Sequence, residues 1–148
     1  MKKLLSLLLT LCFSAYSQTK CILYLDRYDM TSPELCQIIK TFVIDKLSDK
    51  DICYIGARET KQGKRVWISA DEKGGLIDEN IKRIKGYMML FDRLFLIIDN
   101  PEDLPINRVG TKLRYECRTI LPTLDGGKEW VFLISNNKYY LVRVNLVW

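Results

Sequence analysis

The chain has 148 residues, of which 48% are hydrophobic, 28% charged and 11% aromatic, with a formal net charge of +5. This composition is typical of one globular domain, and it excludes a disordered chain, a collagen-like repeat and a small disulfide knot. The sequence contains no histidine. That absence excludes a Ser/His/Asp or Cys/His catalytic site and a histidine-ligated metal.

The N-terminus has the three parts of a secretory signal peptide. Lys2 and Lys3 give a positive start, residues 4–13 (LLSLLLTLCF) form the apolar segment, and residues 14–17 include small side chains. The apolar segment is shorter than the roughly 20 residues that a transmembrane helix needs. We therefore predict a signal peptide of residues 1–17, cleaved before Gln18.

Two alternatives for this segment are a helix of the folded core and a lipoprotein anchor on Cys12. The first is disfavoured because the segment is apolar on all sides and has no polar stripe. The second is disfavoured because Leu11 is large where such an anchor requires a small residue. We expect an exported chain, periplasmic or extracellular, with no transmembrane span and a single domain of residues 18–148.

Four cysteines remain after cleavage: Cys21, Cys36, Cys53 and Cys117. An even number in an oxidising compartment allows up to two disulfides, in any of three connectivities. Each cysteine also falls on the apolar face of its expected element, so buried free thiols are the alternative. No C-x-x-C spacing occurs, and neither a thioredoxin-like site nor a zinc site is predicted.

Residues 21–25 are an apolar run typical of a strand, and a helix is expected to follow it. Thr31 and Glu34 have the spacing of a capping box, and Pro33 suits the first helical turn. Apolar residues then recur at helical spacing: Leu35, Ile38, Ile39, Phe42, Val43 and Leu47. We expect Phe42, near the middle of this stripe, to be buried.

Strands are predicted at residues 52–57 and 65–69, and the stretch from 76 to 98 is ambiguous between a helix and a hairpin. Gly86 would lie inside the helix, and residues 87–91 have no polar face. We choose a hairpin of residues 87–91 and 94–98, preceded by a helical turn around residues 78–83.

The C-terminal third alternates with the period of strands. In residues 112–120, Leu113, Tyr115 and Cys117 face one way, while Lys112, Arg114, Glu116 and Arg118 face the other. Further strands are expected at 129–134 and 139–148, joined by a tight turn at Asn136-Asn137. In the last strand, we expect one shared face for Tyr140, Val142, Val144, Leu146 and Trp148.

Together these elements predict an α+β fold. One N-terminal amphipathic helix packs on an antiparallel meander sheet of about six to eight strands. The helical stripe should contact the sheet face of Leu113, Tyr115 and Cys117, and that of Val142, Val144 and Leu146.

No catalytic, cofactor or metal site is recognised in the sequence. Carboxylates lie close together in two loops, Asp26 with Asp29, and Asp99 with Glu102 and Asp103. Such groups could form a glycosidase pair or a calcium site, but loops favour aspartate in any protein. The paired glycines at 74–75 and 126–127 lack the spacing of a phosphate-binding loop.

Surface contacts are predicted at Arg65, Trp67, Arg114 and Arg118. Trp67 lies on the strand face opposite Val66, and further basic residues cluster at positions 61–64 and 82–85. A solvated sheet face explains the same pattern. Export argues against a nucleic-acid partner, which leaves an acidic protein or a carboxylated glycan.

The sequence thus favours a small exported binding module without a catalytic site, such as an inhibitor, an immunity-type protein or a component of a surface assembly. Its partner would be another protein or a glycan in the envelope. The alternative is a carboxylate-dependent hydrolase acting on extracytoplasmic polysaccharide. That enzyme requires two carboxyl groups about 5–9.5 Å apart in a cleft.

Overall fold

The computed structural model of the chain describes residues 19–72, 74–121 and 127–146. The predicted signal peptide therefore lies outside the described residues. The strands are β1 (Lys20–Met30), β2 (Ile52–Thr60), β3 (Gly63–Asp71), β4 (Leu76–Ile77), β5 (Ile84–Leu90), β6 (Arg93–Ile98), β7 (Ile106–Ile120), β8 (Lys128–Ser135) and β9 (Lys138–Leu146). The helices are α2 (Pro33–Phe42) and α3 (Asp78–Arg83), with 3-10 turns η1 (Ile44–Lys46) and η2 (Pro101–Asp103).

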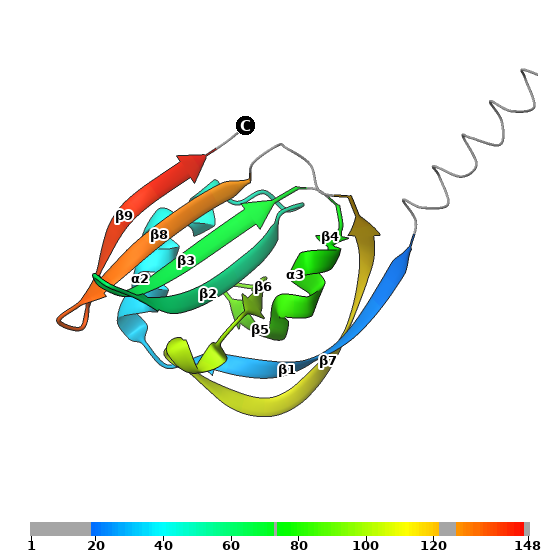
Figure 1. Cartoon of the computed structure of the whole chain (residues 1–148), viewed down its shortest axis with the longest axis horizontal. Coiled ribbons are helices and arrows are strands. Elements are labelled where there is room, and N and C mark those ends of the chain that lie inside the picture. The colour runs from blue at the N-terminus through cyan, green and yellow to red at the C-terminus, as the bar shows by residue number, and fades with distance from the viewer. Residues whose placement is uncertain (1–18, 73, 122–126, 147–148) are drawn as a thin grey trace, which may run out of the picture.

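The strands form one nine-stranded sheet in the order β4-β7-β1-β5-β6-β2-β3-β8-β9 (Figure 1). Five neighbouring pairs are antiparallel, but β1–β5, β2–β6 and β4–β7 are parallel. The protein combines helix and sheet, yet the prediction of an antiparallel meander carrying an N-terminal helix is wrong. The sheet is mixed and dominates the fold, and α2 is not N-terminal, because β1 precedes it as the apolar run at residues 21–25 predicts.

The strands do not follow one another as in a meander, because β5 and β6 lie between β1 and β2 in the sheet. The central strands β2 and β6 are buried on both faces. Tyr54 and Leu96 belong to one apolar cluster, while Ile55 and Ile97 belong to the cluster on the opposite face. Strands with nearly continuous apolar runs and two covered faces are typical of parallel pairing.

The helix α2 begins one residue later than the capping-box spacing indicates. Ser32 is the N-cap, and its hydroxyl accepts a hydrogen bond from the Leu35 N–H at 3.2 Å. Pro33 occupies the first turn, where its missing N–H costs nothing. Thr31 instead bonds the Pro105 carbonyl through both its N–H and its hydroxyl, at 2.8 Å each.

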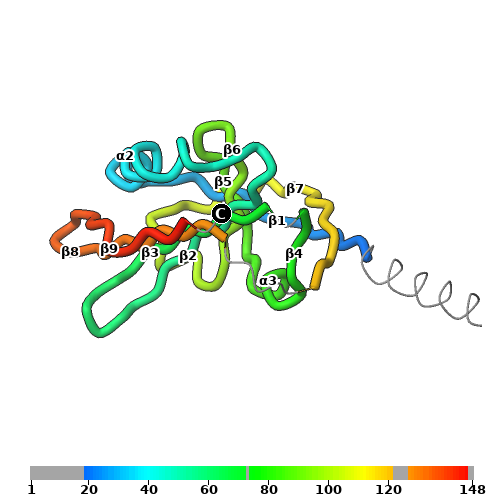
Figure 2. The backbone as a smooth tube through the Cα atoms, turned by 90° about the horizontal axis from the view of Figure 1, so that it is seen from above, coloured from blue at the N-terminus to red at the C-terminus, as the bar shows by residue number. Residues whose placement is uncertain are grey.

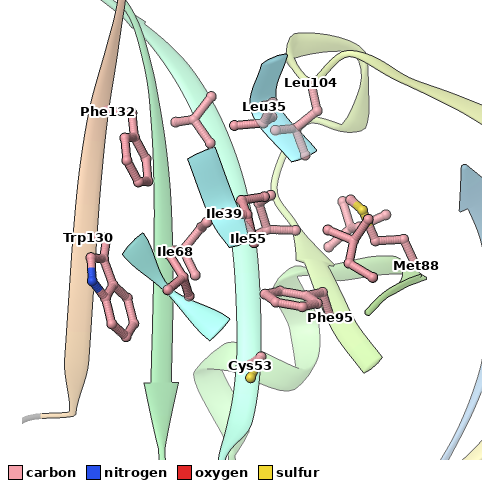
Figure 3. Close-up of a cluster of buried hydrophobic side chains, with 14 of the residues drawn as sticks. Leu35, Ile39, Cys53, Ile55, Ile68, Met88, Phe95, Leu104, Trp130 and Phe132 are labelled. Carbon is pink, nitrogen blue, oxygen red and sulfur yellow. The ribbon is translucent and has the colours of Figure 1, made fainter. Parts of the chain in front are cut away.

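The first core lies between α2 and the sheet (Figure 3). Leu35, Ile39 and Val43 of the predicted stripe are fully buried. Their partners come from β2, β3, β5, β6 and β8 and include Ile55, Ile68, Met88, Phe95, Ile97, Trp130 and Phe132. Phe42 is 43% exposed, so its expected burial is wrong. It ends the helix at the edge of this core, with its ring centroid 6.5 Å from that of Phe132.

The second core lies on the opposite face of the sheet. Figures 1 and 2 show α2 and α3 on opposite sides of the strands, with β1 and β7 curving around α3. The buried members of this core are Leu25, Tyr54, Leu76, Ile84, Tyr87, Leu96 and Ile98. Leu113, Tyr115 and Cys117 pack here, so their predicted contact with the helical stripe is wrong. The curvature of β1 and β7 turns them toward α3 instead.

Two local predictions are confirmed. Residues 84–98 form the β5–β6 hairpin, and α3 occupies the expected helical turn at residues 78–83. Asn136 and Asn137 form the β8–β9 turn with φ values of 52° and 60°. Asparagine tolerates this left-handed conformation better than most residues.

The prediction that alternate residues from Tyr140 to Trp148 share one face of β9 is wrong, because the strand contains a β-bulge. Val131 pairs with Arg143, but Phe132 pairs with Leu141, which leaves Val142 as the extra residue. The bulge shifts the alternation of the strand, so residues on its two sides no longer share a face. Tyr140, opposite Leu133, and Val144, opposite Trp130, therefore lie on different faces, whereas Val144 and Leu146 still share one. Leu146 packs against the first core, while Val142 and Val144 are 46% and 45% exposed. Trp148 lies outside the described residues.

Cys21 and Cys117 are directly opposite each other in the β1–β7 pair and form a disulfide, with a Cα–Cα distance of 4.9 Å. Cys36 and Cys53 are free thiols. Burial raises the pKa of the Cys53 thiol to about 11, which makes it unreactive at neutral pH. Within the described residues, no helix is long and apolar enough to cross a membrane.

Candidate binding site at the C-terminal edge of β2 and β6

A cluster of charged residues forms where the parallel strands β2 and β6 end. Because these neighbours run in the same direction, their C-terminal ends meet at one edge of the sheet. Arg58 lies near the end of β2, and Asp99 directly follows β6. The antiparallel strand β5 begins at this edge, which brings in Arg83 from the end of α3 and Lys85. We call these four residues the Asp99 cluster.

Arg83 and Asp99 form a two-point ion pair. The Arg83 Nε and Nη2 atoms lie 2.8 Å and 2.6 Å from the two carboxylate oxygens of Asp99. The Asp99 backbone N–H also donates to the Arg83 carbonyl at 3.0 Å. Asp99 has a φ of 67°, so the contacts hold it in a left-handed conformation that few residues adopt.

The charges of the cluster favour the ionised form of Asp99. The hydrogen bonds from Arg83 lower the pKa of the Asp99 carboxyl group, and the positive charges of Arg83, Lys85 and Arg58 lower it further. Burial acts in the opposite direction. Asp99 is therefore a carboxylate at neutral pH, paired with Arg83 and stabilised by the positive charges of Lys85 and Arg58.

Trp67 lies beneath Arg83. The ring occupies space above Gly56, where a Cβ atom would come within 2.5 Å of the Trp67 Cζ2 atom. The guanidinium carbon of Arg83 lies 5.9 Å from the ring centroid, which is a cation–π contact. Trp67 is half-buried and also packs against the second core. The backbone of β2 and Arg83 thus fix the ring in place.

A pocket of about 580 Å³ adjoins the Asp99 cluster. Its lining residues include Tyr28, Lys85, Asp99, Asn100 and Glu102. The pocket therefore presents an aromatic ring, an ammonium group, an amide and two carboxylates.

The four predicted contact residues do not form one surface. Arg65 and Trp67 lie two residues apart on one face of β3, next to the Asp99 cluster. Arg114 and Arg118 lie on the outer face of the β1–β7 pair, turned away from the second core. Arg114 forms an ion pair there with Glu116.

Most of the candidate carboxylates are held by cations. Three of them form ion pairs apart from Asp99: Asp26 with Arg108 at 3.0 Å, Asp29 with Arg27 at 3.3 Å, and Asp103 with Lys64 at 3.8 Å. In the described ranges, no group of three or more Cys, Asp or Glu side chains is placed to hold a metal ion. Glu102 is exposed and lines the pocket.

Sequence reasoning missed Tyr28, Arg58 and Asn100 as site residues. The basic residues at positions 82–85 can be recognised in the sequence. The residues that lie near them in the fold cannot, because the parallel pairing of β2 and β6 brings those residues to the same edge of the sheet. The signal for that pairing is the continuous apolar sequence of both strands.

No protein-family model, curated protein sequence or solved structure matches the chain. Its function is therefore inferred from the residues at this edge of the sheet.

Proposed function

We propose that the chain is an exported binding module that holds an anionic partner, a protein or a glycan of the envelope, at the Asp99 cluster. The observation that supports this is the two-point ion pair of Arg83 with Asp99 beside Trp67, at the sheet edge where Arg58 and Lys85 also lie. Arg83 forms an ion pair with Asp99, whereas the side chains of Arg58 and Lys85 are exposed to solvent. Two cations thus remain to attract a negative group, and arginine with tryptophan is a composition common at binding hot spots.

The state of Asp99 favours binding over hydrolysis. A glycosidase needs one carboxylic acid whose pKa is raised, so that it can donate a proton to the leaving group. Arg83 lowers the pKa of Asp99 instead. Asp99 is therefore unsuited to act as the general acid of the alternative hydrolase.

The export part of the proposal rests on the N-terminal sequence. Mass spectrometry of the chain produced in a bacterial host should find a mature N-terminus at Gln18. An intact Met1 on material from the cytoplasm would contradict export, and a lipid on Cys12 would contradict cleavage at residue 17.

The binding part is tested by charge reversal at the cluster. The Arg58→Glu/Lys85→Glu variant is compared with Lys112→Glu/Arg118→Glu, which makes the same change of net charge on the outer face of β1–β7. The probes are immobilised polygalacturonate and immobilised polyglutamate at low ionic strength. We expect the wild-type chain and the outer-face variant to be retained on at least one probe, and the cluster variant to lose about tenfold or more in affinity.

Equal retention of the two variants would contradict the proposal, since net charge alone would then govern binding. Failure of the wild-type chain to bind either probe would contradict it as well. Circular dichroism of all three proteins checks that each is folded.

A further inference from the structure

The pocket beside the Asp99 cluster has the size of a ligand site. Its volume of about 580 Å³ lies within the range of about 300–1,000 Å³ found for small-molecule pockets, and it is shallow and open to solvent, so it would contact one side of a ligand. Its lining groups are mainly polar and chemically diverse, whereas the centre of a protein interface is apolar and poor in charge. A small unit rich in hydroxyl groups fits this lining better than a protein side chain.

Tyr28 supplies an aromatic wall. A Cβ atom at Gly86 would lie 2.5 Å from the Tyr28 Cε2 atom, so the ring rests directly on the backbone of β5. Tyr28 also packs against the first core, which fixes its ring without covering it fully. A rigid aromatic ring with a polar tip is suited to the C–H face of a sugar ring.

Asn100 and Glu102 supply hydrogen-bonding groups that the protein does not use. In the described part of the chain, neither side chain forms a hydrogen bond or an ion pair with another residue. The amide both donates and accepts, and the carboxylate accepts only. Together they match a pair of neighbouring hydroxyl groups.

Lys85 and Arg58 favour an acidic sugar over a neutral one. Lys85 lines the pocket, and Arg58 lies near the end of β2 at the same edge of the sheet. A carboxylate on the sugar would replace the water around the exposed ammonium group of Lys85, and the charge of Arg58 would favour its approach. We infer that this pocket binds one uronic acid residue of an acidic polysaccharide, an inference that rests on the proposed function and names the class of its ligand.

The test separates hydrogen bonding from simple electrostatics. The Asn100→Ala/Glu102→Gln variant removes one negative charge from the pocket. If attraction between charges were the whole of binding, this variant would bind polygalacturonate more tightly than the wild type. If the pocket bonds sugar hydroxyls, it should bind polygalacturonate about tenfold more weakly.

The matched control is Asn107→Ala/Glu116→Gln, which makes the same chemical change at exposed positions of β7. Polyglutamate provides carboxylates without hydroxyl-bearing rings, and neutral dextran provides rings without carboxylates. We expect the pocket variant to lose affinity for polygalacturonate alone, the control variant to bind as the wild type does, and dextran to bind at least tenfold more weakly than polygalacturonate.

Unchanged or tighter binding of polygalacturonate by the pocket variant would overturn the sugar inference. If the Arg58→Glu/Lys85→Glu variant still lost its affinity, the proposed function would stand without that inference. Binding of polyglutamate alone by the wild-type chain would overturn the sugar inference too, and it would identify the partner as an acidic protein.

Discussion

The Lys128 Nζ atom lies 2.9 Å from the Asp51 Oδ2 atom, and the two side chains are only 11% and 0% exposed. The same oxygen accepts a hydrogen bond from the Ser48 N–H at 2.8 Å. Asp51 directly precedes β2 and Lys128 begins β8, and both of these strands pair with β3. The buried ion pair therefore links the starts of two strands that are not themselves neighbours.

We expect Asp51→Ala to lower the free energy of unfolding by about 1–3 kcal/mol, because it removes a buried carboxylate that pairs with Lys128 and accepts a hydrogen bond from the Ser48 N–H. Denaturant unfolding at neutral pH measures the loss. Asp49→Ala, at an exposed position, is the control and should stay within about 0.5 kcal/mol. Equal losses for the two variants would show that the pair does not hold the strands together.

A second prediction compares two residues of the apolar stripe of α2, which differ in burial. Ile39 is fully buried, whereas Phe42 is 43% exposed. We expect Ile39→Ala to cost about 2–5 kcal/mol through lost burial and a cavity. Phe42→Ala should cost only about 1 kcal/mol, because much of its ring is already in water. Denaturant unfolding of both variants decides this, and a larger loss for Phe42→Ala would mean that the helix is rotated from its described position.

The β5–β6 hairpin and the β8–β9 turn could be predicted because each depends on residues that are close together in the sequence. The turn at Asn136-Asn137 requires residues that accept positive φ, and the hairpin of residues 84–98 has two apolar runs joined by a short turn. The order of strands could not be predicted in the same way. Pairing of β1 with β7 joins residues as far apart as Cys21 and Cys117, and it depends on which surfaces bury each other.

The candidate site was predicted only in part for the same reason. Arg65 and Trp67 were recognisable from the alternation of one strand. Asp99 was noted as a loop carboxylate, but its contact with Arg83 depends on the tertiary arrangement of α3 and β6. The site residues come from separate segments, and only the parallel pairing of β2 and β6 brings their ends together.

The disulfide provides a third prediction. Cys21 and Cys117 are separated by 96 residues, so their link restricts a long loop of the unfolded chain. We expect Cys21→Ser/Cys117→Ser to lose about 4–5 kcal/mol of stability. Thermal unfolding with and without a thiol reductant measures the effect. The reductant should lower the Tm of the wild-type chain and leave that of the variant unchanged, and an equal shift in both would contradict the pairing.

Arg83→Gln should raise the pKa of Asp99 toward its ordinary value, because the hydrogen bonds from Arg83 are the largest cause of its lowering. Carbon NMR of the carboxyl group measures this pKa. Arg27→Gln, which removes the surface partner of Asp29, is the control and should leave Asp99 unchanged. An unchanged Asp99 pKa in Arg83→Gln would contradict the described ion pair.

The pH dependence of stability follows from the same lowered pKa. Since the folded pKa of Asp99 lies below its unfolded value, the ion pair stabilises the protein fully at neutral pH and is lost as the pH falls through the folded pKa. Both side chains are more than one third exposed, so the effect is at most about 1 kcal/mol. The stability difference between the wild type and Arg83→Gln should be largest at neutral pH and shrink in acid.

The most direct test of the binding account is an NMR titration of the ¹⁵N-labelled chain with trigalacturonate. The account predicts that the largest shifts of backbone amide signals occur at Tyr28, Lys85, Asn100 and Glu102, around the pocket beside Asp99. The signals of Lys112 and Glu116, on the outer face of β1–β7, should stay in place. Shifts centred on that outer face, or no shifts at all, would contradict the account.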